Sequence, residues 1–208
     1  REFYWKALYS FSKNESEHLA FCEKAKQAYK NIFNRVGIGD KTYITLASGG
    51  TFSKFSHEFQ TICDAGEDVI YISKDDYGKG LEMDPGRGAI NKEIWTNDLK
   101  KDLGMKDFVE KKAIEVGNIF TLGTKFSEPF DLKYKSEKGE DKMVFMGSYG
   151  IGIGRVMGTI VEVHHDDKGI IWPEAVAPFK VHLILIESKE NKKIKDTADK
   201  LYQDLQTK

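Results

Sequence analysis

The chain has 208 residues, of which 40% are hydrophobic and 12% aromatic, and its 32 Lys and Arg residues nearly balance 33 Asp and Glu residues. This composition excludes a disordered, collagenous or disulfide-stapled chain, and a formal charge of -1 does not indicate a basic nucleic-acid surface. Cys22 and Cys63 lack the CxxC spacing of a metal or redox site, which predicts reduced thiols in a cytoplasmic protein. The longest apolar runs are far shorter than the ~20 residues that a membrane span needs, so we expect no membrane insertion.

A strand and then an amphipathic helix open the chain. Trp5, Tyr9 and Phe11 alternate along the first segment, so a strand would carry them on one face, either toward a ligand or into the core. Apolar residues then recur at helical spacing over 17–36, and Asn14 supplies a candidate N-cap. The predicted apolar face consists of Leu19, Cys22, Ala25, Tyr29, Ile32, Phe33 and Val36.

Strand periodicity then replaces helical periodicity. Segments 42–46, 55–62 and 69–73 are predicted strands, and the turn residues just before 69 favour neighbouring antiparallel strands. The next stretch, 74–97, is rich in charge, Gly and Asp, which is typical of a surface excursion with little structure of its own. Residues 112–116 are the following strand candidate.

A hairpin signature precedes a glycine-rich turn. Segments 132–134 and 143–146 flank a run of polar turn residues. The second segment continues into Gly150-x-Gly152-x-x-Arg155, after which apolar residues take helical spacing. The sequence therefore predicts a strand that enters a glycine turn and leaves as a helix.

A domain boundary is predicted near Pro178. A buried-strand pattern over 181–186 and a helical stripe over 194–205 follow this residue. No internal repeat or low-complexity tract accompanies them. The sequence therefore predicts one large unit followed by the first strand and helix of a second unit.

The glycine turn is the strongest local candidate for a binding site. Glycines let a ligand approach the backbone closely, and free N–H groups at a helix start attract an anion such as phosphate. A tight strand-to-helix connection without a ligand is the plain alternative. A dinucleotide site is disfavoured, because Arg155 replaces its third small residue and the preceding hairpin indicates an antiparallel sheet. Arginine can instead clamp phosphate oxygens.

Three further polar groupings lie outside this turn. His57 and Glu58 are adjacent and would face opposite sides of a strand, with no second histidine at the spacing of a zinc site. Glu115 shares a strand face with Gly117, so its carboxylate could hold a cation beside a phosphate or could be an ordinary edge carboxylate. Residues 164–167 are better explained as a solvated helix end than as metal ligands.

Together these segments resemble the bacterial kind of prolyl-tRNA synthetase, a class II aminoacyl-tRNA synthetase. The matching blocks, in the order of that family, are 1–11, 56–59, 115–127, 146–152 with Arg155, 169–173 and 177–179. The resemblance implies an α+β fold in which the class II antiparallel sheet, flanked by helices, forms a partial catalytic core over 1–178. The first strand and helix of an α/β anticodon-binding domain would follow over 179–208.

The same resemblance implies an activity and its ligands. The expected reaction is ATP-dependent activation of proline to prolyl-adenylate and transfer to tRNA(Pro), by a homodimeric cytoplasmic enzyme that uses Mg²⁺. Arg155 matches the arginine that grips the ATP tail and is the expected catalytic residue, and Glu115 is the expected contact for Mg²⁺. The expected ATP-binding residues are Arg1, Phe3, Glu115, Asn118, Gly150, Gly152, Gly154 and Arg155. The expected proline-binding residues are Trp5, Tyr9, His57, Glu58, Phe120 and Ser148.

Some positions depart from the family pattern. Ala7 stands where the family has an acid and Asn118 where it has a histidine, which leaves open a catalytically dead synthetase paralogue that acts as a binding or regulatory module. The threonyl class II enzyme is a weaker alternative, because no zinc-ligand set accompanies the motifs. Motif 1, the proline-amine loop and the motif 2 arginine would precede Arg1, so we expect the chain alone to be inactive.

The interval 60–114 is short compared with bacterial members that carry an editing insertion there. We therefore expect no editing in cis. A hydrophobic pocket excludes a smaller amino acid by only ~1–3 kcal/mol, so some misactivation of alanine is expected.

Overall fold

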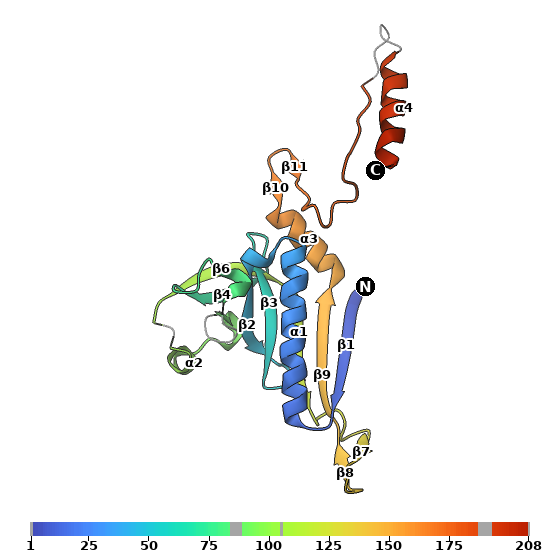
Figure 1. Ribbon diagram of the computed structural model, residues 1–208. Coiled ribbons are helices and arrows are strands. Elements are labelled where there is room, and N and C mark those ends of the chain that lie inside the picture. The colour runs from blue at the N-terminus through green and yellow to red at the C-terminus, as the bar shows by residue number, and fades with distance from the viewer. Residues whose placement is uncertain (1, 84–88, 105, 187–192, 208) are drawn as a thin grey trace. The chain divides into compact units, whose positions relative to one another are not determined.

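The computed structural model describes residues 2–83, 89–104, 106–186 and 193–207 (Figure 1). The chain divides into two compact units, Arg1–Ala175 and Val176–Lys208. The first unit is a mixed α+β fold with a central sheet flanked by helices, which confirms the predicted class. The identity of the second unit as the start of an anticodon-binding domain stays a prediction.

The described residues form the following elements. The helices are α1 (Glu15–Arg35), α2 (Asn97–Asp102), α3 (Ile153–Val163) and α4 (Lys193–Gln206), with 3₁₀ turns η1 (Gly39–Lys41), η2 (Gly80–Glu82) and η3 (Lys92–Ile94). The large sheet contains β1 (Trp5–Ser12), β2 (Thr42–Ser48), β3 (Phe55–Ile62), β4 (Asp68–Ser73), β5 (Ala89–Asn91), β6 (Phe108–Gly123) and β9 (Phe145–Gly152). Two small hairpins pair β7 (Lys133–Lys135) with β8 (Asp141–Met143) and β10 (His165–Asp166) with β11 (Gly169–Ile170).

The strand order of the large sheet is β1-β9-β6-β3-β2-β5-β4. Its pairings in the described ranges are antiparallel except that of β2 with β5, which is parallel through Leu46 and Ile90. Strand β4 also pairs with β6, so β6, β3, β2, β5 and β4 close into a ring. A buried cluster from β2, β4, β5, β6 and the residue just after η2 consists of Tyr43, Ile70, Ile72, Met83, Ala89 and Ala113. Strand β9, which leads into the glycine turn, is antiparallel to both of its neighbours, β1 and β6, and this excludes the parallel βαβ unit of a dinucleotide site there.

Helix α1 begins at the predicted cap. The Glu17 backbone N–H donates to Asn14 Oδ1 at 2.9 Å, which satisfies one free donor of the first turn. Its buried residues are His18, Cys22, Ala25, Lys26, Tyr29 and Phe33. Leu19 and Ile32 are exposed, so the prediction was wrong for these two residues. The buried side of the helix includes His18 and Lys26, which a pattern of apolar residues does not count.

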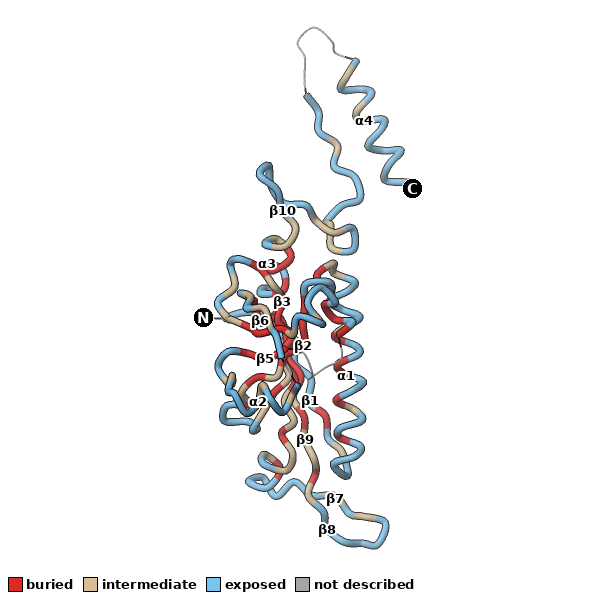
Figure 2. Tube along the Cα trace, turned by 90° about the vertical axis from the view of Figure 1, so that its left-hand side faces the viewer, coloured by how far each residue is buried: buried red, intermediate tan, exposed pale blue. Residues whose placement is uncertain are grey.

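Helix α1 covers one face of the sheet (Figures 1 and 2). The Phe59 ring of β3 lies 5.1 Å from the Tyr29 ring and 5.3 Å from the Phe33 ring of α1, measured between centroids. On β1, every second residue beginning with Trp5 points away from α1, and Trp5 is 50% exposed. Because side chains alternate along a strand, the same face carries Gly150 of β9. The face opposite α1 is therefore the one available to a ligand.

Three predictions about organisation were wrong. Strands β3 and β4 do not pair with each other, because β3 lies between β2 and β6 while β4 pairs with β5 and β6. The stretch 74–97 is no simple excursion, since β5 inserts between β2 and β4 with all its residues buried. The strand expected over 181–186 is not formed: Ile184 is 74% exposed, and among the described residues of this unit no strand lies beside it to complete a ladder.

Candidate functional site

Strand β9 enters α3 through the glycine turn, and the indole of Trp5 lies on that turn. A Cβ atom placed on Gly150 would stand 2.0 Å from Trp5 Cζ2, and one on Gly152 would stand 3.4 Å from Trp5 Cζ3. The ladder sets this proximity, because Trp5 is the register partner of Gly152. Only glycine at position 150 leaves room for the indole, so β9 and the aromatic residue of β1 form one surface.

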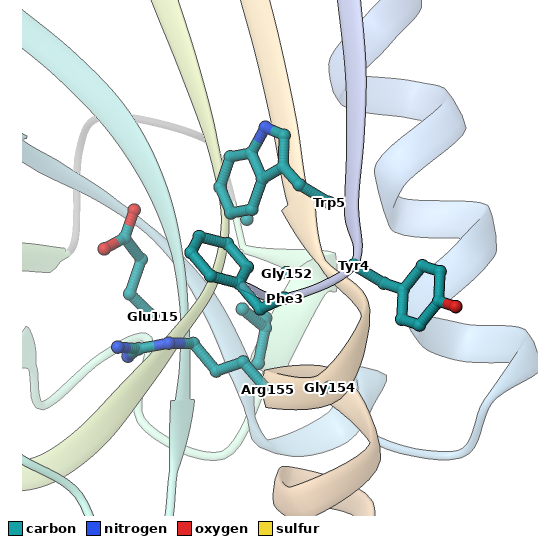
Figure 3. A pocket seen from close by; sticks show the side chains of 9 residues that line it. Phe3, Tyr4, Trp5, Glu115, Gly152, Gly154 and Arg155 are labelled. Atoms are coloured by element: carbon teal, nitrogen blue, oxygen red, sulfur yellow. The ribbon is translucent and has the colours of Figure 1, made fainter. Parts of the chain in front are cut away.

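A first cavity of about 420 Å³ opens beside this surface. It is lined by Phe3, Tyr4, Trp5, Glu115, Val116, Gly117, Gly152, Gly154 and Arg155. The side chains of Phe3, Trp5, Glu115 and Arg155 converge on it, whereas the ring of Tyr4 points away (Figure 3). Gly152 is the N-cap of α3 and offers no side-chain cap, so the first N–H groups of this helix remain available to an anion.

Charge in the first cavity is mixed. The Arg155 guanidinium donates to the Glu67 carboxylate from the turn between β3 and β4, and both side chains are about half exposed. Burial raises the pKa of Glu115 above its ordinary value, while the Asn118 amide and the Arg155 charge oppose that shift. The cavity therefore combines aromatic walls, one cationic group that can bind phosphate and one carboxylate that can bind a cation.

A second cavity of about 520 Å³ lies on the same face of the sheet. Its lining consists of Trp5, Ser48, Gly49, Gly50, Thr51, Phe52, Glu58, Glu115, Asn118, Phe120, Ser148 and Gly150. The Phe52 ring packs 5.1 Å from the Phe120 ring between centroids, and Lys125 donates to the Thr51 carbonyl. These contacts hold the β2–β3 loop against the cavity. Trp5 and Glu115 line both cavities.

A buried network of carboxylates and amides forms the polar floor of the second cavity. Glu58 Oε2 accepts from Gln60 Nε2 at 2.9 Å and from Asn91 Nδ2 at 3.0 Å. Asn118 Nδ2 donates to Glu115 Oε1 at 3.0 Å and lies 3.5 Å from Glu58 Oε1. Burial raises the pKa of Glu58 to about 7, and the nearby Glu115 charge adds to this shift. The side-chain oxygens of Gln60 and Asn118 are buried without a partner.

Two expected site residues, His57 and Tyr9, line neither cavity. His57 faces α1, where its Nε2 lies 3.5 Å from Lys26 Nζ, and burial lowers its pKa to about 4. Alternation along β3 sends Glu58 to the face that carries the two cavities and His57 to the face that α1 covers, so the expected contact of His57 with proline has no support from either cavity. Tyr9 shares the face of Trp5 but is 55% exposed and lines neither cavity. Arg1 lies outside the described residues.

Sequence reasoning missed residues that support the site. Gln60, Asp68 and Asn91 extend the polar network, with Gln60 Nε2 also donating to Asp68 Oδ2 at 2.7 Å. Gln60 follows Glu58 by two positions on β3, so alternation could have suggested that they share a face. Nothing in the local pattern marks Asn91, because it belongs to the stretch interpreted as an excursion.

Ala7 and residues 164–167 line neither of the two cavities. Ala7 pairs with Gly150. Across the described part of the chain no group of three or more His, Cys, Asp or Glu residues could hold a metal ion, so residues 164–167 form no metal centre there. No helix in the described ranges is long and apolar enough to cross a membrane.

Comparison with known proteins places the chain among synthetases. Residues 1–164 match the family described as tRNA synthetase class II core domain (G, H, P, S and T). The proline–tRNA ligase of Rickettsia akari (strain Hartford) is 36% identical over 215 residues, which cover 100% of this chain and 49% of that protein. The proline–tRNA ligase of Hyphomonas neptunium (strain ATCC 15444) is 37% identical over 201 residues, which cover 88% of this chain and 45% of that protein. The chain spans about half the length of the curated relatives it matches.

Proposed function

We propose that this chain, which belongs to the class II core domain family of tRNA synthetases, supplies the ATP-binding and proline-binding part of a proline–tRNA ligase. The observation that carries the proposal is that Trp5, Glu115 and Arg155, which are distant in the sequence, line one cavity. A second cavity shares Trp5 and Glu115 with the first. Two ligands in adjoining cavities would meet at the shared residues, as a reaction between a nucleotide and an amino acid requires.

The proposed chemistry has two steps. A carboxylate oxygen of proline attacks the α-phosphorus of ATP, the bond to the bridging oxygen breaks, and pyrophosphate leaves. A terminal ribose hydroxyl of tRNA(Pro) then attacks the carbonyl carbon of prolyl-adenylate, and AMP leaves. Negative charge on the phosphoryl oxygens must be stabilised during the first step, and in this proposal Arg155 and the first N–H groups of α3 would do so.

The class II family uses ATP and a metal ion in general, and the residues around Glu115 fit Mg²⁺. This ion is usually held by one or two carboxylates together with substrate phosphates and waters. Glu115 lines both cavities, and the buried Asn118 Oδ1 nearby has no hydrogen-bond partner. Glu115 would therefore hold the ion, which would neutralise charge on the phosphate oxygens.

The second cavity suits the ring of proline. The proline side chain is a small apolar ring, and the aromatic walls of this cavity come from Trp5, Phe52 and Phe120. Ser148 supplies a hydroxyl on β9. Such walls distinguish proline from alanine mainly by lost contact area, so we expect measurable activation of alanine.

Proline-dependent exchange between ATP and pyrophosphate by the complete gene product tests the proposal. We expect exchange in the wild type and a loss of at least about 100-fold in Arg155→Ala, because a group that stabilises phosphoryl charge is removed. Arg35→Ala, at an exposed arginine in the last turn of α1, is the matched control and should keep wild-type activity. An inactive wild type would instead support the dead paralogue with a binding or regulatory role.

Three finer proposals accompany this function. The complete enzyme is proposed to act on tRNA(Pro), to be cytoplasmic and to be a homodimer. Its mass in solution would test the dimer. Residues 1–208 alone are expected to show no exchange. Full-length protein is expected to leave alanyl-tRNA intact, and rapid hydrolysis without a helper protein would contradict the absence of editing in cis.

A further inference from the structure

The segment Asn91–Glu93, at the junction of β5 and η3, contacts two residues that line the second cavity, Glu58 and Ser48. Asn91 is 7% exposed, and its Nδ2 donates to Glu58 Oε2 at 3.0 Å. Its Oδ1 accepts from the Glu93 backbone N–H at 3.2 Å, as the N-cap of η3. Because the oxygen is used for capping, the amide nitrogen is directed to Glu58. The orientation of Asn91 is therefore set locally, before any ligand binds.

A second hydrogen bond runs from the same segment to the cavity loop. Glu93 Oε1 accepts from the Ser48 backbone N–H at 2.6 Å. The Ser48 carbonyl accepts from Ser56 Oγ at 3.0 Å, so the backbone of Ser48 is held from two directions. Ser48 begins the row of residues 48–52 that lines the second cavity. Glu93 therefore anchors the loop at the point where it leaves β2.

The position of this segment depends on β5. Its residues Ala89 and Ile90 are fully buried, and Ile90 pairs with Leu46 of β2 and with Tyr71 of β4. Neither Asn91 nor Glu93 lines a cavity, so both can act on a ligand only through Glu58 and Ser48.

We propose that Asn91 and Glu93 are positioning residues of the proline cavity, Asn91 by holding the Glu58 carboxylate against Asn118 and Glu93 by holding Ser48. This inference rests on the proposed function for the identity of the ligand. It assigns a role in the site to a segment whose sequence is typical of a surface turn. The first cavity, which the proposed function assigns to ATP, contains neither Glu58 nor Ser48, so the larger effect is expected on proline binding.

Kinetics of the complete gene product separate this role from general damage. In proline-dependent exchange, Asn91→Ala should raise the KM for proline about tenfold, because a hydrogen bond to a buried carboxylate is lost. Glu93→Ala should raise it by about two- to fivefold, since this contact is exposed. The KM for ATP should stay within about twofold in both. Glu93→Gln retains the acceptor oxygen and should restore wild-type values, and Lys92→Ala, at the exposed residue between them, is the neutral control.

Hydrogen exchange of backbone amides supplies a readout that needs no catalysis. Glu93→Ala should speed exchange in residues 48–53 relative to wild type and Glu93→Gln, whereas α1 should be unchanged. Unaltered exchange there, or equal changes in the KM values for ATP and proline, would overturn the positioning role. An inactive wild type whose residues 48–53 still respond to Glu93→Ala would refute the proposed function and leave the positioning role standing.

Discussion

Replacing Glu58 with glutamine should stabilise the chain at alkaline pH and leave it nearly unchanged at acidic pH. Glu58 is 8% exposed, and burial raises its pKa from 4.5 to about 7, with the Glu115 charge adding to the shift. The folded state therefore holds a proton that the unfolded state releases between these values. The contribution of this proton to the free energy of unfolding is complete below the pKa of Glu58 in the unfolded state. It is lost as the pH rises through the pKa of Glu58 in the folded state. Glutamine removes the titration while keeping the size of the side chain.

The size of the effect follows from the pKa shift. A rise from 4.5 to about 7 corresponds to roughly 3 kcal/mol, because one pKa unit equals about 1.4 kcal/mol. Hydrogen bonds from Gln60 and Asn91 favour the ionised form and are already included in the shift. The free energy of unfolding of Glu58→Gln minus that of wild type should thus grow by about 3 kcal/mol from about pH 4.5 to about pH 8.

The pH dependence of the wild-type free energy of unfolding cannot test Glu58 by itself, because His57 also contributes to it. Its pKa is lowered to about 4 by burial and by Lys26, so its contribution is present above the unfolded pKa and is lost as the pH falls through the folded pKa. This trend opposes that of Glu58, but it is common to both proteins and cancels in the difference. Urea unfolding at several pH values, followed by circular dichroism and by tryptophan fluorescence, would measure it. A difference that does not vary with pH, or a variant less stable than wild type at about pH 8, would refute the reasoning.

Three other substitutions test the packing that supports the site. Gly150→Ala should displace the Trp5 indole, since its Cβ would stand 2.0 Å from Trp5 Cζ2, and should lower proline-dependent exchange about tenfold or more; equal activity would show that the indole is not part of the site. Phe33→Ala, at a fully buried residue, should cost about 3–5 kcal/mol in urea unfolding. Asn14→Ala should lower the free energy of unfolding by about 1 kcal/mol in the same measurement, because the capping acceptor of α1 is lost. An unchanged free energy would show that this cap does not stabilise the helix.

Sequence patterns predicted the helices, strands and turns that are determined by residues close together in the sequence. The N-cap of α1 was predictable from Asn14 because a side-chain oxygen near a helix start has few other partners. Strand β3 has the predicted bounds, 55–62, since alternation and flanking turn residues mark both ends. The strand, glycine turn and helix around Gly150 also formed as predicted. The hairpin before that turn also formed, but β7 and β8 pair only with each other, and the antiparallel partners of β9 are the distant strands β1 and β6.

Contacts that depend on distant strands were not predictable in this way. Strand β5 has three residues, which is too short for a periodic signal, and it is fixed by pairing with both β2 and β4. Asn91 therefore looked like part of a surface turn. Alternation placed His57 and Glu58 on opposite faces, yet it could not say which face α1 covers. That choice depends on where Tyr29 and Phe33 pack, which is a property of the tertiary fold.

The precision of the site derives from strand register more than from side-chain contacts. Trp5 is held opposite Gly152, and Gly150 is held opposite Asn118, so the ladders fix the indole and the amide relative to each other across three strands. A shift of one residue in β1 would turn Trp5 toward α1 and leave both cavities without their common aromatic wall. Since the same indole and Glu115 border both cavities, the spacing between two bound ligands is set by the backbone of β1, β9 and β6. The proposed reaction between a nucleotide and an amino acid would need that spacing held to a fraction of an ångström, and a central antiparallel sheet is a suitable support for it.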